Sequence, residues 1–177
     1  GKVVNNSQLH LGAFYNGVLH GVMSFGCPMD RSKVIGLVRD TKWNDFFELN
    51  RMAFDDFLPR NSESRCIAIA IRLIKKHYPN IEWILSFADG TQCGDGTIYR
   101  ASGFVLTGIN PNKSILQFPT GDKIANLVLT ALWECEEVRE LCKKMNVEHK
   151  YRTVKEWKAL GVKELEGYML RYIYFVN

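Results

Sequence analysis

The stretch from residue 46 to residue 88 constrains the fold of this chain more than any other. Residues 46–54 are apolar and β-prone, and the turn before Pro59 ends them. A helix with a regular apolar stripe follows and ends near Tyr78. Residues 81–88 then form a nearly continuous apolar run, which is typical of a central strand covered on both faces. This order predicts a β-α-β unit of the α/β class, with its two strands as parallel neighbours.

The helix of this unit has one apolar and one basic side. Its apolar residues recur at helical spacing, at Cys66, Ile67, Ala70, Ile71, Leu73 and Ile74. Its basic residues are Arg65, Arg72, Lys75 and Lys76. The basic side is either a solvated helix face or a surface that binds phosphates, and the first interpretation is the more common one.

The segment before this unit predicts a β-hairpin. Residues 9–15 and 18–25 are apolar, β-prone runs, and the dipeptide Asn16-Gly17 between them is the one that a type I′ turn prefers. Residues 29–43 have few periodic apolar positions, so we expect a loop with a short helical piece.

The segment after the unit has a less regular pattern. We expect a helical turn over 97–102, a strand over 104–107, a loop over 110–121, a helix over 123–145, a small helix over 153–160 that ends at Gly161, and a strand over 168–176. No repeat, low-complexity tract or linker interrupts the chain, so its 177 residues are expected to form one domain. Residues 1–8 lack an initiator methionine and suggest a processed or truncated start.

Composition restricts the environment more than the function. No apolar run approaches the roughly 18 residues that a membrane span requires, so we expect no membrane partner. Five cysteines without a C-x-x-C pair or zinc-like spacing, and with no signal peptide before them, fit a cytoplasmic protein. A net charge of +4 and a pI of about 8.8 are compatible with nucleic acid or an anionic cofactor and diagnostic of neither.

The start of the helix after residue 59 is a candidate anion site. Unpaired backbone N–H groups and the helix dipole both favour a bound negative charge at such a position. Arg60, Asn61, Ser62 and Ser64 are therefore candidate phosphate contacts. The alternative is that Asn61 or Ser62 only caps the helix, since the segment matches neither the P-loop nor the dinucleotide-binding pattern.

Three further residues are candidates for chemistry. Asp89 ends the central strand, where it could act as a general base, a metal ligand or a hydrogen-bonding partner for a base edge, or simply form the turn before Gly90. Tyr99, beside Arg100, could donate a proton or stack on a nucleobase, or pack against the helix. Cys93 lies in a glycine-rich loop and is a weak candidate nucleophile, because no partner histidine is evident.

Arg51 is a fourth candidate, because a cation inside a strand needs a carboxylate or a phosphate as its partner. Glu48 and Asp89 are the two acids that we consider for this pairing.

Four separated motifs carry a family resemblance. They are E-L-N-R at 48–51, P-R-N-S-E-S-R at 59–65, S-F-A-D at 86–89 and G-T-I-Y-R-A-S-G-F at 96–104. In this order and at these intervals they closely resemble the Mom family of bacteriophage DNA adenine-modification proteins. The resemblance covers about residues 9–108, and the chain from Asn110 onward adds little to it.

The resemblance implies a fold and an activity. The fold would be similar to the GNAT acyltransferases, in which a central mixed sheet with flanking helices opens to admit acetyl-CoA and a helix N-terminus binds the pyrophosphate. The activity would convert adenine N6 in DNA to a carbamoylmethyl form that protects phage DNA from restriction in the host cytoplasm. A CoA thioester and iron would take part, and DNA would be the partner.

The resemblance also assigns residues to the site. The arginine, serine, acid and tyrosine that matter in the family fall on Arg51, Ser64, Asp89 and Tyr99. It makes Asp89 a metal ligand or a contact to adenine, and Tyr99 a catalytic or positioning group. Arg51 and Ser64 would contact the cofactor or frame the site.

One departure from the family concerns the metal. Its members usually carry a His-Tyr pair just before the first hairpin, and residues 1–8 of this sequence contain no such pair. Either the pair lies before Gly1, or the protein works without it; His10 and His20 are poor substitutes on sequence grounds. Two other functions remain open: an N-acetyltransferase for a small amine or a protein, and a phage binding protein that kept the fold without activity.

Overall fold

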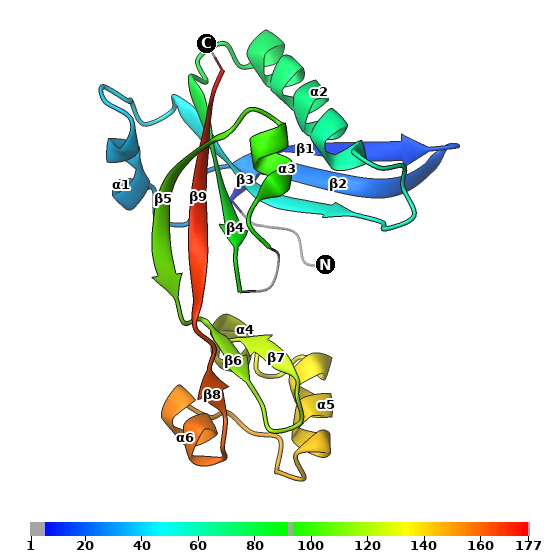
Figure 1. Cartoon of the computed structure of the whole chain (residues 1–177), viewed down its shortest axis with the longest axis vertical. Coiled ribbons are helices and arrows are strands. Elements are labelled where there is room, and N and C mark those ends of the chain that lie inside the picture. The colour runs from blue at the N-terminus through cyan, green and yellow to red at the C-terminus, as the bar shows by residue number, and fades with distance from the viewer. Residues whose placement is uncertain (1–5, 92–93, 177) are drawn as a thin grey trace. The chain divides into compact units, whose positions relative to one another are not determined.

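The computed structural model describes residues 6–91 and 94–176 (Figure 1). Contacts divide the chain into two compact units. The first comprises Gly1–Ala88, Asp95–Gly108 and Leu170–Asn177, and the second comprises Asp89–Gly94 and Ile109–Met169. Cys93, the candidate nucleophile, lies outside the described residues. The expectation of a single domain stays a prediction.

A six-stranded sheet is the main element of the structure. Its order is β1-β2-β3-β4-β9-β5, with bounds β1 Ser7–Tyr15, β2 Val18–Gly26, β3 Phe46–Phe54, β4 Trp83–Asp89, β9 Gly167–Phe175 and β5 Val105–Asn112. β1, β2 and β3 are antiparallel neighbours, whereas β3 and β4 are parallel. The sheet is therefore mixed, and the predicted β-α-β unit is confirmed.

The segment before β3 also has the predicted structure. Asn16 and Gly17 both take positive φ angles, of 49° and 79°, as a type I′ hairpin turn requires. The polar segment that follows contains α1 (Arg31–Val34) and a short 3₁₀ helix (Ile35–Leu37). These two turns confirm the expected helical piece within a loop.

Helix α2 (Ser62–His77) packs on one face of the sheet through Ile67, Ala70, Ile71 and Ile74. Leu73 does not belong to this buried stripe, because 37% of it is exposed. The four residues of the basic side of the helix are all exposed, as a solvated face requires. Lys75 donates a hydrogen bond to the carbonyl oxygen of Val176.

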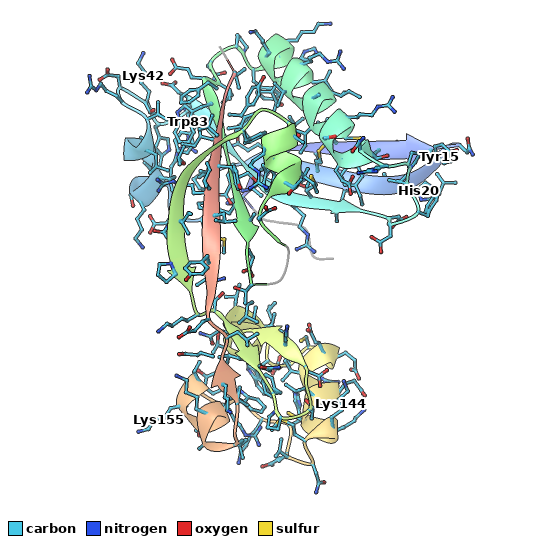
Figure 2. The ribbon with its side chains drawn as sticks, in the orientation of Figure 1. Tyr15, His20, Lys42, Trp83, Lys144 and Lys155 are labelled. Carbon is cyan, nitrogen blue, oxygen red and sulfur yellow. The ribbon has the colours of Figure 1, made fainter. Side chains whose placement is uncertain are left out.

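The opposite face of the sheet is covered by the α1 segment. Phe46, Trp83, Leu85 and Ile173 are buried there, against Val34, Ile35, Leu37 and Val38. The rings of Phe46 and Trp83 stack at 4.2 Å, and the Trp83 indole N–H donates to Thr41 Oγ1 at 3.1 Å (Figure 2). Both faces of β4 are therefore covered, which explains its continuous apolar sequence.

The second unit has its own small sheet and core. The strands β6 (Ile115–Gln117), β7 (Lys123–Ala125) and β8 (Lys163–Glu164) are antiparallel and lie in the order β7-β6-β8. Three helices accompany them: α4 (Asn126–Ala131), α5 (Glu136–Lys144) and α6 (Val154–Ala159). The buried cluster of this unit includes Leu116, Phe118, Leu129, Leu141 and Trp157.

Two predictions for this unit are wrong. The expected loop over 110–121 contains the end of β5 and all of β6, and the expected helix over 123–145 is divided into β7, α4 and α5. Ile124 pairs with Leu116 and enters the core, so strand pairing overrides the helical periodicity there. The small helix near 153–160 is confirmed, with a Thr153–Glu156 capping box and Gly161 at a φ of 88°.

Two general properties hold for the described residues. None of their helices is both long and apolar enough to cross a bilayer. Their four cysteines, at positions 27, 66, 135 and 142, are all free.

Candidate active site

The two parallel strands of the β-α-β unit pair only briefly and then part. Their register has three residue pairs: Phe46 with Trp83, Phe47 with Ile84, and Glu48 with Leu85. β3 and β4 both continue beyond the last pair, and Figure 1 shows them diverging. Backbone groups on the facing edges after Glu48 and Leu85 are therefore not paired with each other, and a ligand can bind between them.

A β-bulge in β3 accompanies the parting. Arg51 pairs with Ser24 of β2 and Leu49 pairs with Phe25, so Asn50 is an extra residue on β3. The Asn50 amide accepts a hydrogen bond from the Ser7 hydroxyl and donates one to the Cys27 carbonyl oxygen, both at 3.1 Å. Bulges bend and twist a strand, so this one helps to turn β3 away from β4.

Glu48 lies at the point where the strands part. It is half-buried, and burial raises the pKa of its carboxyl group to about 7. A carboxyl group with such a pKa exchanges its proton near neutral pH, as a general base must. From the sequence, Glu48 is expected only as a partner for Arg51; the available indication of a larger role is an acid that directly follows two phenylalanines in the strand.

Ser86 is the first residue of β4 beyond the paired segment. Its side chain is fully buried, and its hydroxyl has no hydrogen-bond partner among the described residues. Side chains alternate along a strand, so Ser86 lies on the α2 side with Ile84 and Ala88. Glu48 lies on the other side with Phe46. At the point where β3 and β4 separate, a titratable carboxyl group thus lies on one face of the sheet and an unpaired hydroxyl group on the other.

The start of α2 lacks the side-chain cap that the sequence predicts. Asn61 occupies the cap position with a φ of 68°, and its side chain makes no capping hydrogen bond. The hydroxyls of Ser62 and Ser64 instead donate to the carbonyl oxygens of Pro59 and Asn61, at 2.5 and 3.1 Å. No side chain therefore caps the first turn by a hydrogen bond, although Asn61, one of the two residues expected to cap the helix, does occupy the N-cap position.

This arrangement leaves donors at the helix start. Ser62 N–H bonds to the Pro59 carbonyl and Arg65 N–H to the Asn61 carbonyl, whereas the N–H groups of Glu63 and Ser64 have no acceptor among the described residues. Arg60 is exposed beside them. Two free N–H groups, the helix dipole and one guanidinium together suit an anion such as a phosphate.

Arg51 does not form the predicted ion pair. Its side chain is exposed, and no acid, Glu48 and Asp89 included, pairs with it in the described part of the chain. Its guanidinium is available to an external anion.

Asp89 lies in the second unit and accepts hydrogen bonds from two residues of that unit. Its Oδ1 accepts from the Thr91 backbone N–H at 2.9 Å and from the Asn112 amide at 3.1 Å. The first of these bonds is an Asx turn, so the turn-forming interpretation of Asp89 fits the structure.

A complete iron site is not formed by residues 6–91 and 94–176, where no group of three or more His, Cys, Asp or Glu side chains could hold a metal ion. The hairpin histidines have other partners. His10 Nδ1 lies 3.0 Å from the Ser24 hydroxyl, and His20 Nδ1 lies 2.9 Å from Asp55 Oδ2 (Figure 2). The described residues therefore do not fit the iron that the resemblance implies.

Tyr99 lies in α3 (Thr97–Ala101), which contacts α2. Its ring packs near Phe104 and Tyr172, with centroids 5.6 and 5.5 Å away. Arg100 Nη2 donates to Asp95 Oδ2 at 2.5 Å, and the Tyr172 hydroxyl donates to the Asp95 carbonyl at 2.6 Å. These contacts fix the helix that carries Tyr99.

Gly96 explains part of the G-T-I-Y-R motif. It has a φ of 71°, and a Cβ atom at this position would collide with the ring of Tyr172. Only glycine meets both conditions, so the motif preserves the entry to α3.

Comparison with known proteins gives the family. The model of the Mom protein family matches residues 1–177. This chain belongs to the Mom protein family. It is also 44% identical over 108 residues to the protein named methylcarbamoylase mom of Escherichia phage Mu, over 60% of this chain and 44% of that protein. The match therefore spans less than half the length of this relative of the Mom family.

A solved structure shows the same fold. A protein of Bacillus anthracis str. Ames classed as a streptothricin acetyltransferase, in complex with acetyl coenzyme A, aligns with a TM-score of 0.50 and 13% identity. The alignment covers 99% of this chain and 69% of that protein. The GNAT-like acyltransferase fold predicted for this Mom-family chain, with its mixed sheet and flanking helices, is confirmed.

Proposed function

We propose that this chain belongs to a transferase that uses a CoA thioester to modify adenine N6 in DNA, giving a carbamoylmethyl-type group that protects phage DNA from restriction. The observation that carries the proposal is Glu48, with its pKa of about 7, at the parting of β3 and β4. Two comparisons support it: a phage Mu relative named a methylcarbamoylase, and a fold that occurs with acetyl coenzyme A in a Bacillus anthracis protein.

The start of α2 is proposed to bind the pyrophosphate of the CoA thioester. The N–H groups of Glu63 and Ser64 have no acceptor among the described residues, and Arg60 adds a positive charge. Asn61 and Ser62 hold the turn that exposes these donors. A bound thioester would supply the two-carbon unit of the modification, and the open edges of β3 and β4 supply backbone groups that can orient it.

Glu48 is proposed to accept the proton that N6 loses when its new bond forms. The exocyclic amine of adenine is a weak nucleophile, because its lone pair is delocalised into the ring, so a nearby base lowers the barrier. At pH 7 Glu48 is divided between its two protonation states and can take up that proton. Glu48 is the last paired residue before the backbone edges proposed to bind the thioester, which makes it the candidate base of this site.

The other predicted site residues remain proposals. Arg51, which is exposed and unpaired in the described part of the chain, is proposed to bind a DNA phosphate. Asp89 is proposed as a contact to adenine, and Tyr99 as a positioning group. N6 is paired within duplex DNA, so the substrate must be single-stranded or have its adenine flipped out.

The experiment that tests the proposal is an incubation of the protein with acetyl-CoA and plasmid DNA, followed by mass spectrometry of the digested DNA. A panel of small amines and peptides runs in parallel. We expect a mass increase on adenosine from the digested DNA, and we expect it only when the CoA thioester is present in the incubation. Unmodified adenine together with robust acetylation of an amine would overturn the proposal in favour of an ordinary N-acetyltransferase.

A separate measurement tests the alternative that the protein is a phage binding protein without catalytic activity. DNA from cells that express the protein should resist restriction, and Asp89→Ala should remove that resistance. Unchanged sensitivity of the DNA, with folded protein present in the cells, would indicate a binding protein without activity.

A further inference from the structure

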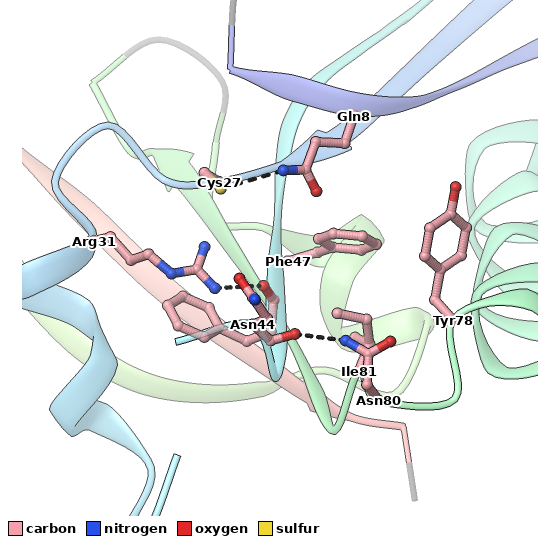
Figure 3. A pocket seen from close by; sticks show the side chains of 9 residues that line it. Gln8, Cys27, Arg31, Asn44, Phe47, Tyr78, Asn80 and Ile81 are labelled. Atoms are coloured by element: carbon pink, nitrogen blue, oxygen red, sulfur yellow. Dashed lines mark hydrogen bonds between the residues drawn. The ribbon is translucent and has the colours of Figure 1, made fainter. Parts of the chain in front are cut away.

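A polar pocket lies where β3 and β4 begin, around the first residues of their paired segment (Figure 3). Its volume is about 290 Å³. Buried Phe47 and Ile81 form its apolar part, and the exposed side chains of Gln8, Asn44 and Asn80 contribute polar groups. The size is near the lower limit for small-molecule sites, so the pocket suits one small ligand or one unit of a longer one.

Arg31 is the unusual residue of this pocket. It is only 6% exposed, and its guanidinium carbon lies 4.2 Å from the Phe46 ring centroid and 5.1 Å from that of Trp43. Its Nη2 donates one long hydrogen bond, of 3.5 Å, to the Phe46 carbonyl oxygen. Nε and Nη1 have no partner among the described residues. These two atoms carry one and two N–H groups, so three donors of a buried cation have no acceptor.

The acids near Arg31 in the sequence have other partners. Asp30 pairs with Lys33 at 2.8 Å, and Asp45 Oδ2 accepts from the Lys42 backbone N–H at 2.8 Å. No carboxylate lines the pocket. A guanidinium cannot give up its proton in a protein, so its burial without an anion is costly. The sequence did not indicate this residue, because Arg31 lies in a polar loop with no motif.

We propose that this pocket binds a phosphate group, with Arg31 as its anchor. The Asn44 side-chain amide and the Tyr78 hydroxyl have no hydrogen-bond partner among the described residues, so they can donate as well. Arg31 belongs to α1, Asn44 to the loop before β3 and Tyr78 to the end of α2, so three elements contribute donors to the lining of the pocket. The Phe46 and Trp43 rings lie close to the guanidinium carbon in cation–π contacts, which hold the cation in place without supplying a hydrogen-bond acceptor in the plane of its N–H groups.

This inference does not depend on the proposed function. The pocket lies at the start of the paired segment of β3 and β4, whereas Glu48 lies at its end and the edges proposed for CoA follow it. Phosphate binding can be measured without a CoA thioester and without DNA. Failure of one proposal therefore leaves the other standing.

The test is a titration of ¹⁵N-labelled protein with inorganic phosphate at constant ionic strength, followed by NMR. The Arg31 Nε–H resonance, assigned by its loss in Arg31→Lys, and the Asn44 side-chain amide should shift with one dissociation constant. A second titration uses a 5′-phosphorylated dinucleotide. Equal affinities indicate a free phosphate as ligand, and tighter binding of the dinucleotide indicates a phosphate carried by a nucleotide chain; both support the site.

Two variants and one control make the test decisive. Arg31→Gln should weaken phosphate binding about tenfold to a hundredfold, because a charge-assisted hydrogen bond is lost. Asn44→Asp, at an exposed position, should weaken it similarly by placing a carboxylate beside the guanidinium. Arg39→Gln changes an exposed arginine outside the pocket and should leave binding unchanged. Phosphate shifts that avoid Arg31 and Asn44, or equal affinity in all folded variants, would overturn the proposal.

Discussion

Glu48 and Arg31 are both polar residues in apolar surroundings near the same pair of strands, and they meet the cost of burial differently. Glu48 can stay neutral, and burial raises the pKa of its carboxyl group to about 7. Arg31 has no neutral form available, and three of its N–H groups lack an acceptor in the described part of the chain. Glu48 can therefore act as a proton acceptor near neutral pH, whereas Arg31 stays charged and needs a bound anion.

The largest expected effect is on the reaction. Glu48→Gln keeps the size of the side chain and removes the base, so the rate of adenine modification should fall by about 10²- to 10⁴-fold. The pH profile of any residual rate should lose the inflection near pH 7. Rates are measured by mass spectrometry of the DNA product, with Glu82→Gln at an exposed position as the matched control. A rate in Glu48→Gln within twofold of the wild type would exclude Glu48 as the base.

The second effect is on the pH dependence of the free energy of unfolding. Because the folded pKa of Glu48 is above its unfolded value of about 4.5, the folded state holds the proton more tightly. The contribution of protonated Glu48 to the free energy of unfolding is therefore fully present below pH 4.5 and is lost as pH rises through about 7. The free energy of unfolding should fall by about 1–3 kcal/mol across this window relative to Glu48→Gln.

Urea unfolding at several pH values measures this difference. If the free energy of unfolding changes equally with pH in the wild type and in Glu48→Gln, burial does not hold the proton on Glu48. Glu48 and Arg31 would then not differ in how they meet the cost of burial.

A smaller effect is expected when Arg31 is replaced by an apolar residue of similar length. Arg31→Met removes a buried charge whose donors lack acceptors, so in phosphate-free buffer the stability should stay equal or rise by about 1–2 kcal/mol. Chemical denaturation checks this, with Arg39→Met as the exposed control. A loss above about 3 kcal/mol would show that Arg31 stabilises the fold through its ring contacts, as large losses come from identifiable structural roles.

The smallest effect concerns the hydroxyl at the parting. Ser86→Ala removes a fully buried group without a partner among the described residues, so stability should change by less than about 1 kcal/mol. If the hydroxyl donates to the CoA thioester, its loss should raise the dissociation constant for CoA by about tenfold. Isothermal titration calorimetry of CoA distinguishes this result from an unchanged constant, which would assign Ser86 to packing alone.

The sequence predicted the elements that depend on short stretches of chain, and it failed where an element depends on pairing with a distant segment. The hairpin turn at Asn16-Gly17 follows from φ preferences, and the β-α-β unit follows from apolar periodicity and run length. In the second unit, Ile124 lies in a strand because Leu116 is its neighbour across the sheet. That pairing depends on a segment eight residues away, and the sequence around Ile124 contains no sign of it.

The site was predicted less completely for a similar reason. The positions at the start of α2 were found, because an anion-binding helix start has a local pattern. The pKa of Glu48 depends on how strands and loops bury it, and the unpaired state of Arg31 depends on which acids fold away from it. Neither property is a feature of a short motif.

The extra residue in β3 makes the length of the E-L-N-R motif as important as its letters. Leu49, Met52 and Phe54 belong to one hydrophobic cluster, because the bulge takes up the extra residue between them. Removing Asn50 alone would leave Arg51 opposite Ser24 and these side chains on their present face, but it would remove the local bend and the hydrogen bonds to Ser7 and Cys27. A relative that lacks this one residue would therefore keep the surface of β3 and lose the bend that turns the strand away from β4.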